Sequence, residues 1–141
     1  MTDALKPEVA GQRAQRKPRV LVADDEITIM TTLKVILSLE GFDVEVARNG
    51  EEAVAKALAW RPDLVLSDVV MPGMNGVDAS IRIVNSLPGC KIVLMSGHAV
   101  VHDLMKDARA RGHDFDVLPK PVHPDELIDH LRMVLRRDSA L

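Results

Sequence analysis

Short apolar runs alternate with helix-like patterns along this chain. Three of the runs are continuous and rich in branched residues, which is typical of strands covered on both faces of a parallel sheet. They occupy residues 20–23, 64–66 and 92–95, and weaker strand candidates occupy residues 44–47 and 115–118. The hydrophobic pattern therefore predicts five strands.

Between the predicted strands, apolar positions recur at the spacing of an amphipathic helix. Gly41 is expected to stop the first helix in a left-handed conformation, Asn49 to cap the second, and Pro124 to begin the last. The second helix should end before Pro62. The other helices carry apolar stripes, which are Ile27, Met30, Leu33 and Leu37, then Val77, Ile81 and Val84, then Val101, Leu104, Met105 and Ala108, and finally Leu127, Ile128, Leu131 and Leu135.

The predicted order is five β-α units in succession. Right-handed crossovers then give an α/β fold of the flavodoxin-like class, a doubly wound (βα)5 domain with a five-stranded parallel sheet. In the flavodoxin-like strand order 2-1-3-4-5, ligands bind at the carboxyl ends of the strands, near the point where the order reverses. We assign residues 19–137 to this domain, residues 1–18 to a polar, disordered N-terminal tail and residues 138–141 to a short C-terminal tail.

Charge argues against one class of partner. The chain has 141 residues, and 18 Lys and Arg against 21 Asp and Glu give a formal net charge of −3. Residues 1–18 hold four of the basic and two of the acidic side chains, so the remainder of the chain carries −5. Because a nucleic-acid surface needs clustered Lys and Arg, we expect no nucleic-acid partner.

The sequence also lacks the signals of a membrane or secreted protein. No apolar run approaches the roughly 18 residues that crossing a bilayer requires. The first residues do not combine a charged start with an apolar stretch, and Cys90 is the only cysteine. We therefore expect a cytoplasmic protein that has no membrane partner and no disulfide framework.

Polar residues gather where the predicted strands end. Asp24 and Asp25 follow the first strand, Asp68 the third, Ser96 the fourth and Lys120 the fifth. If the first and third strands are neighbours, their three carboxylates converge on one rim of the sheet. Two unit charges about 4 Å apart repel by about 4 kcal/mol at an effective dielectric near 20, so such a cluster calls for a cation or for protonation. An oxygen-only ligand set predicts a hard divalent cation, Mg²⁺.

These strand ends also predict a type of chemistry. A carboxylate that remains free to attack beside the metal can accept a phosphoryl group. A lysine and a hydroxyl from neighbouring strands can then contact the phosphoryl oxygens. Lys120 and Ser96 stand where those two roles are required.

Four motifs occur in order along the chain. They are the Asp24-Asp25 pair, DVVMPGMNG at residues 68–76, MSGH at residues 95–98 and LPKP at residues 118–121. Together they resemble the receiver domain of response regulators in two-component signalling, in its single-domain, chemotaxis-regulator-like form. The resemblance covers residues 19–137, and the four motifs at this spacing are specific, although each alone is weak.

Position by position, the resemblance implies a role for each site residue. Asp68 would accept a phosphoryl group, Lys120 would contact that group, and Ser96 would be the switch hydroxyl. The peptide bond between Lys120 and Pro121 would be cis. The Mg²⁺ ligands would be Asp24, Asp25, Asp68 and the backbone carbonyl of Val70.

The resemblance also implies partners. The phosphoryl group would come from a sensor histidine kinase or a histidine phosphotransfer protein, and phosphorylation would switch binding to a downstream protein or formation of a dimer. The domain would be a signalling module rather than an enzyme acting on a separate substrate. The few residues after the last predicted helix leave no room for an output domain, unless the chain is a fragment of a larger regulator.

One position of this sequence departs from the family pattern, and one histidine is expected next to the site. The family usually has Tyr or Phe three residues before the lysine, where this chain has Val117. Phe115 lies two positions upstream, which leaves open a displaced switch residue or a core phenylalanine. His98 should lie at the rim of the site, whereas the other four histidines are scattered without metal-ligand spacing.

Two other function classes stay open at this point. One is a receiver-shaped interaction module that is not phosphorylated, which the substitution at Val117 makes conceivable. The other is a Mg²⁺-dependent phosphohydrolase with an aspartyl nucleophile. Hydrolases that resemble haloacid dehalogenases pair the nucleophile with an acid two residues later, where this chain has Val70, and that difference disfavours turnover.

Overall fold

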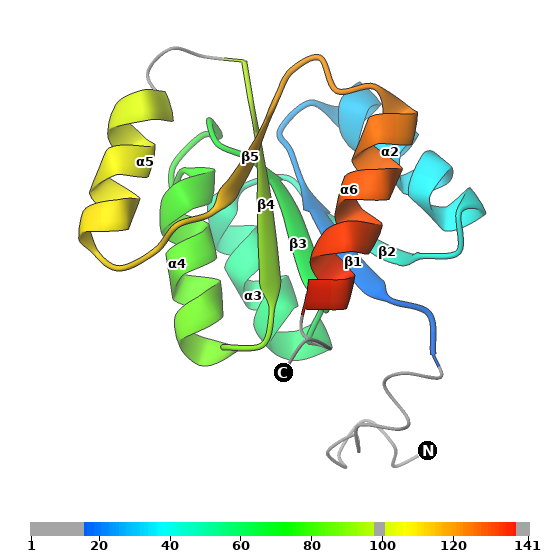
Figure 1. The fold of residues 1–141 in the computed structure, drawn as a ribbon, viewed down its shortest axis with the longest axis horizontal. Coiled ribbons are helices and arrows are strands. Elements are labelled where there is room, and N and C mark those ends of the chain that lie inside the picture. The colour runs from blue at the N-terminus through cyan, green and yellow to red at the C-terminus, as the bar shows by residue number, and fades with distance from the viewer. Residues whose placement is uncertain (1–15, 98–100, 138–141) are drawn as a thin grey trace.

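A computed structural model describes residues 16–97 and 101–137. Strands and helices alternate throughout these residues (Figure 1). The strands are β1 (Arg19–Ala23), β2 (Asp43–Ala47), β3 (Leu64–Asp68), β4 (Lys91–Ser96) and β5 (Asp116–Pro119). The helices are α2 (Ile27–Leu39), α3 (Gly50–Trp60), α4 (Gly76–Ser86), α5 (Val101–Ala110) and α6 (Pro124–Arg136).

The five strands form one parallel sheet in the order β2-β1-β3-β4-β5. Helices α2 and α6 cover one face of this sheet, and α3, α4 and α5 cover the other (Figure 1). Because both faces are covered, all five residues of β3 are buried. The predicted doubly wound fold and its strand order are confirmed.

Local signals in the sequence explain most of the helix ends. Gly41 has φ +94° after α2, the left-handed conformation that its lack of a Cβ permits. The Asn49 side chain accepts a hydrogen bond from the backbone N–H of Glu52 at the start of α3, and Pro124 is the first residue of α6. Asn75 caps α4 in the same way by accepting from the N–H of Asp78, a cap that the sequence analysis did not identify.

Three details of the predicted pattern are wrong. Ile27 is 64% exposed at the first position of α2, although it was placed in the buried stripe. Near the end of α6 the buried residue is Val134, whereas Leu135, which was predicted to be buried, is partly exposed and packs against the core. The last strand begins at Asp116 rather than at Phe115. Each error concerns an element end, where apolar periodicity constrains the structure least.

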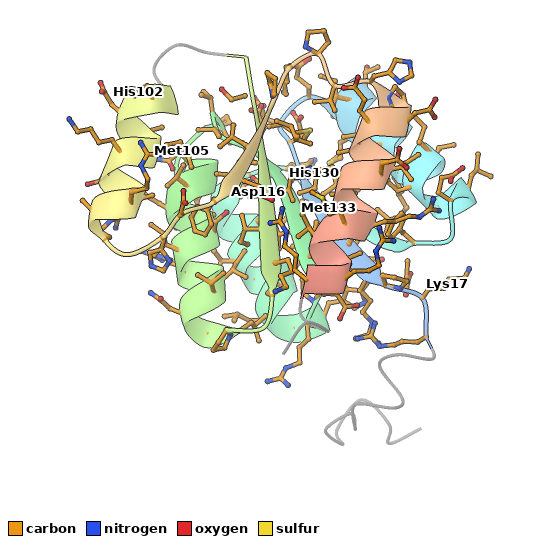
Figure 2. All side chains as sticks on the ribbon, in the orientation of Figure 1. Lys17, His102, Met105, Asp116, His130 and Met133 are labelled. Carbon is orange, nitrogen blue, oxygen red and sulfur yellow. The ribbon has the colours of Figure 1, made fainter. Side chains whose placement is uncertain are left out.

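Residues on both sides of the predicted domain boundary make contacts at the amino ends of the strands, which we call the amino edge of the sheet. Arg16 donates to both oxygens of Asp63, at 2.8 and 3.4 Å, and the backbone N–H of Arg19 donates to Asp63 Oδ2 at 2.8 Å. The Arg19 guanidinium lies over the ring of Trp60, 5.7 Å from its centroid, and donates to the Trp60 carbonyl. Lys17 marks this edge in Figure 2. Residues 1–15 and 138–141, most of the two predicted tails, lie outside the described residues.

Within the described ranges, none of the helices has both the length and the apolar character needed to cross a membrane.

Candidate functional site

The strand ends at the carboxyl edge of the sheet lie side by side. Asp24 N–H donates to the Ala47 carbonyl at 3.0 Å, so β1 continues its pairing with β2 up to the first acidic residue. Asp68 ends β3 in register with Met95 of β4, next to Ser96. Lys120 N–H in turn donates to the Ser96 carbonyl at 2.8 Å, which extends the pairing of β4 with β5. The backbone thus brings every predicted site residue to one edge.

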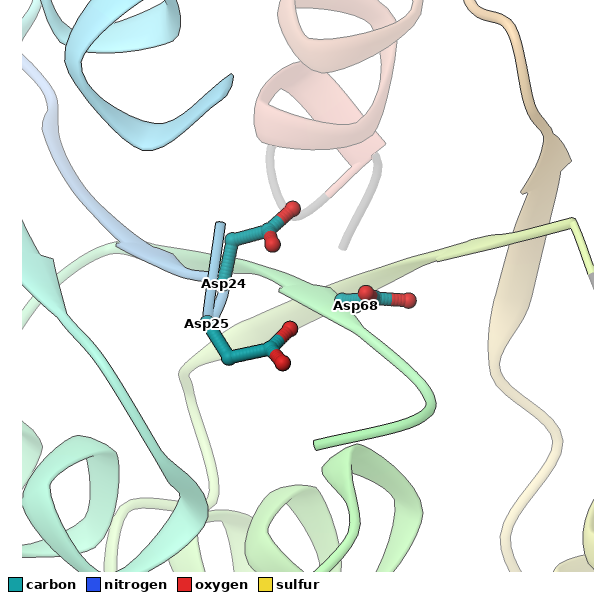
Figure 3. A group of neighbouring side chains, drawn as sticks. All are labelled: Asp24, Asp25 and Asp68. Carbon is teal, nitrogen blue, oxygen red and sulfur yellow. The ribbon is translucent and has the colours of Figure 1, made fainter. Parts of the chain in front are cut away.

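Three carboxylates from two strands form the centre of this edge. One oxygen each of Asp24, Asp25 and Asp68 lie within 4.8 Å of one another. Figure 3 shows the carboxylates of Asp24 and Asp25 extending from the end of β1 toward the strand end that carries Asp68. Asp24 is 0% exposed and Asp68 is 5% exposed, whereas Asp25 is open to solvent. The cluster therefore has a buried floor and an accessible rim.

Lys120 supplies a positive charge to this cluster. Its Nζ lies 3.2 Å from Asp68 Oδ2 and 3.5 Å from Asp24 Oδ2. The lysine side chain is 21% exposed, so it is less buried than the two carboxylates that it contacts. One ammonium against three carboxylates leaves a formal charge of −2 when all the groups are ionised.

The pKa values of the buried groups reflect this crowding. Burial raises the pKa of the Asp24 carboxyl above its ordinary value, and the nearby Asp68 charge acts in the same direction, while the N–H of Glu26 and the charge of Lys120 only partly oppose it. Burial acts to lower the pKa of the Lys120 ammonium, but the attraction of Asp24 and the contact with Asp68 outweigh it and raise that pKa. The fold thus keeps Lys120 charged and makes ionised Asp24 costly.

The oxygens at this edge fit a hard divalent cation. Asp24 Oδ1 accepts from the N–H of Glu26 at 2.9 Å, but Asp24 Oδ2 is buried and has no hydrogen-bond partner among the described residues. A buried carboxylate oxygen without a hydrogen bond is costly unless an ion or water completes it. The cluster is also the only group of three or more potential metal-ligating side chains in the described ranges, and it is all oxygen. The donor set therefore suits Mg²⁺.

The loop from β3 to α4 turns tightly around Asp68. Val70 N–H points toward Asp68 Oδ1 at 3.4 Å, and Gly76 N–H donates to the Val69 carbonyl at 2.8 Å. A Cβ at Gly76 would overlap the backbone carbonyl oxygen of Asp68, so only glycine fits at this position. The sequence analysis quoted Gly76 within a motif but did not identify this steric requirement.

Residues on and next to β5 include Val117, where the family usually has an aromatic switch residue, and Phe115, the suggested replacement. The bond between Lys120 and Pro121 is cis, as predicted. Val117 is 36% exposed in the middle of β5. Phe115 lies before the amino end of the strand, packs against the core cluster of α3, α4 and α5, and stacks on His113. Its position, away from the carboxyl edge, favours the core reading over a displaced switch residue.

The histidines make ordinary local contacts. His123 accepts the N–H of Asp125 at the start of α6. His130 Nε2 lies 3.2 Å from Asp116 Oδ2, and both residues are labelled in Figure 2. His98, predicted at the rim of the site, lies outside the described residues.

Comparison with known proteins gives one consistent family. The model of the family described as "Response regulator receiver domain" matches residues 20–132. The "DNA-binding response regulator MtrA" of Mycolicibacterium paratuberculosis is 34% identical over 123 residues, which are 87% of this chain and 53% of that protein. The "Probable transcriptional regulatory protein TcrX" of Mycobacterium tuberculosis is 34% identical over 92% of this chain and 55% of its own length. The chain spans about half the length of these curated relatives.

Solved structures show the same fold. A receiver domain protein described as CheY-like, from Methanospirillum hungatei, superposes with a TM-score of 0.80 at 27% identity, over 88% of this chain and 98% of that one. The chemotaxis response regulator CheY4 of Vibrio cholerae superposes with a TM-score of 0.71 at 30% identity, over 84% of this chain and 98% of its own.

Proposed function

The chain belongs to the response regulator receiver domain family of two-component signalling, and we propose that Asp68 is its phosphoryl acceptor. The observation that carries this assignment is the position of Lys120 Nζ, 3.2 Å from Asp68 Oδ2 inside a cluster of three carboxylates. Asp68 ends β3, the central strand of the sheet, and Lys120 contacts both Asp68 and Asp24.

The proposed reaction is a single displacement at phosphorus. A carboxylate oxygen of Asp68 attacks the phosphoryl group of a phosphohistidine, the new O–P bond forms as the P–N bond breaks, and the leaving imidazole nitrogen takes up a proton. Lys120 neutralises charge on the phosphoryl oxygens, and the Ser96 hydroxyl at the adjacent strand end hydrogen-bonds one of them. A bound Mg²⁺ would supply charge neutralisation and orientation of those oxygens.

Asp24, Asp25, Asp68 and the Val70 carbonyl are the proposed metal ligands. Asp24 suits a ligand better than a nucleophile because it is fully buried and one of its oxygens is already held by the N–H of Glu26. Its second oxygen lacks a hydrogen bond and faces Lys120 at 3.5 Å. Asp25 is exposed and can coordinate an ion from the solvent side.

Receiver domains exchange phosphoryl groups with histidine kinases, and we propose a sensor kinase or a histidine phosphotransfer protein as the donor here, in the cytoplasm. MtrA and TcrX are named as DNA-binding and transcriptional regulators, and they are about twice as long as the aligned region. Our expectation that this chain has no nucleic-acid partner therefore concerns the residues of the receiver domain alone, and it stays a prediction.

The hydrolase alternative is weaker than the signalling one. The residue two positions after Asp68 is Val70, whose side chain cannot act as a general acid, although it is 38% exposed at the rim of the site. We therefore expect one phosphoryl group per molecule rather than continuous turnover of a phosphate ester.

The direct test is phosphorylation by a small donor. Wild type, Asp68→Asn and Asp63→Asn are incubated with acetyl phosphate and Mg²⁺ and examined by intact mass. We expect one added phosphoryl group in wild type and in Asp63→Asn, and none in Asp68→Asn. Asp63 is the matched control, because it lies at the other end of the same strand. An unmodified wild type would favour the interaction module, and a labelled Asp68→Asn would place the acceptor elsewhere.

A further inference from the structure

The loop between β3 and α4 lies directly on the first turn of α3. The Glu51 carboxylate accepts a hydrogen bond from the backbone N–H of Met74 at 2.8 Å. Two glycines permit this approach: a Cβ at Gly50 would overlap the Met74 carbonyl, and a Cβ at Gly73 would lie 2.8 Å from Glu51 Oε1. Gly73 also has φ +74°, which aims the chain back toward α3.

The same loop carries part of the proposed site. It leaves β3 at Asp68, passes through Val70 and returns to α4 at Gly76, whose N–H closes the turn on the Val69 carbonyl. The backbone ties around Asp68 fix the two ends of this segment. The Glu51 contact holds its middle, on the side away from Lys120 and β5. Movement of the loop would therefore displace the Val70 backbone relative to the acid cluster.

Glu51 and Glu52 differ sharply despite being adjacent. Both lie in the first turn of α3, where a negative side chain interacts favourably with the helix dipole. Glu52 pairs with Lys56 at 3.4 Å and with Arg48 at 3.9 Å. Glu51 is exposed, and its carboxylate contacts the loop. A merely helix-stabilising role would not require one of the two carboxylates to reach across to another element.

We propose that Glu51 is a positioning residue for the metal and phosphoryl site: by accepting the Met74 N–H, it holds the β3–α4 loop so that the Val70 carbonyl stays available to the cation. This inference rests on the proposed function of Asp68. The carboxylate acts through the backbone, as residues behind a metal's direct ligands commonly do by fixing ligand orientation. Because the hydrogen bond is exposed and water can replace it, the effect is moderate.

The test compares three variants: Glu51→Ala removes the acceptor, Glu51→Gln keeps an acceptor without the charge, and Glu52→Ala removes an equal charge from the same turn. Two quantities are measured by amide NMR: the exchange rate of the Met74 N–H without metal, and the Mg²⁺ dissociation constant from a titration with the ion alone. In Glu51→Ala we expect faster exchange and a dissociation constant raised about threefold to tenfold. Glu51→Gln and Glu52→Ala should stay within about twofold of wild type.

Each other outcome counts against the proposal. A Glu51→Ala protein with wild-type Mg²⁺ affinity would overturn it, and so would equal losses in Glu51→Ala and Glu52→Ala, because charge alone would then explain the effect. Failure of Glu51→Gln to restore affinity would show that the hydrogen bond is not the cause. The exchange rate of Met74 is read without metal or phosphoryl donor, so an unlabelled wild type with a normal Met74 response would reject the function of Asp68 and keep the loop contact.

Discussion

One aspartate lies at each end of β3, and the two differ in the partners that balance their charge. Asp63, just before the strand, is 13% exposed at its side chain and receives two guanidinium contacts from Arg16 and the backbone N–H of Arg19. Asp68, the last residue of the strand, is 7% exposed at its side chain and shares one lysine with Asp24. Burial is similar at both ends, but Asp63 has the guanidinium of Arg16 as its partner, whereas Asp68 shares the one ammonium of Lys120 with Asp24.

The difference separates a carboxylate whose charge is balanced within the fold from the proposed phosphoryl acceptor. At the amino edge, paired groups leave little for an external ion to gain. At the carboxyl edge, the acid cluster holds a formal −2 after Lys120 is counted, together with a buried Asp24 oxygen that lacks a hydrogen bond. A site with this excess of negative charge suits an external cation, as we propose.

The largest expected effect on stability comes from neutralising Asp63, the carboxylate whose charge is balanced by Arg16. We expect Asp63→Asn to lower the free energy of unfolding by about 2 kcal/mol, because Arg16 and the Arg19 N–H lose a charged acceptor in a largely buried place. Urea unfolding in EDTA measures this change, and phosphoryl labelling should persist. A variant as stable as wild type would mean that the amino edge does not depend on the pair.

At the carboxyl edge we expect neutralising an aspartate to raise the free energy of unfolding instead of lowering it. Asp24→Asn keeps an oxygen that can accept the Glu26 N–H but removes a charge that burial makes costly. Without metal, this variant should be more stable than wild type by on the order of 1 kcal/mol at neutral pH. It should also lose the increase in melting temperature that Mg²⁺ gives wild type. Destabilisation of the metal-free variant would show that Lys120 already balances Asp24.

The difference in stability between Asp24→Asn and wild type should depend on pH. Because the pKa of Asp24 is raised in the folded state, the folded protein binds more protons than the unfolded one at a pH between the ordinary pKa of the carboxyl and the raised one. Stability contributed by the neutral carboxyl is therefore lost as pH rises through the raised pKa. The stability gap between Asp24→Asn and wild type in EDTA should be small near pH 4 and larger at pH 7, and a gap that shrinks with pH would contradict the assignment.

The smallest expected effect concerns the N-terminal boundary. Deleting residues 1–15 keeps Arg16, whereas deleting residues 1–16 leaves Asp63 with the Arg19 N–H. We expect the second deletion to be less stable than the first by about 0.5 kcal/mol, the size of a partly exposed ion pair. Both should be labelled by acetyl phosphate at the wild-type level. Equal stabilities would mean that Arg16 does not support the amino edge in solution.

Sequence patterns predicted the strands and most site residues because those signals are local. The continuous apolar runs of β1, β3 and β4 reflect burial on both faces, and Asp24, Asp68 and Ser96 immediately follow or end such runs. Parallel pairing then brings the strand ends together, as was expected. The predicted roles of these residues in phosphoryl transfer and metal binding stay predictions.

The contacts that were not predicted join residues with no periodic relation. Nothing in the sequence near Glu51 indicates that its carboxylate reaches Met74, and nothing near Arg16 indicates a partner at Asp63. Both pairs depend on where whole elements lie after the sheet has formed. The prediction for Ile27 was wrong for a related reason. Helical spacing identifies an apolar stripe but does not show at which residue the buried part of the helix begins.

The strand order has a consequence for the way this domain folds during synthesis. Pairing of β1 with β3 brings Asp24 and Asp68 together, but Lys120 arrives only when β5, the last strand to emerge, pairs with β4. An intermediate with four strands in place would expose the acid cluster without its lysine, and we expect divalent cations to stabilise that intermediate more than they stabilise the finished domain.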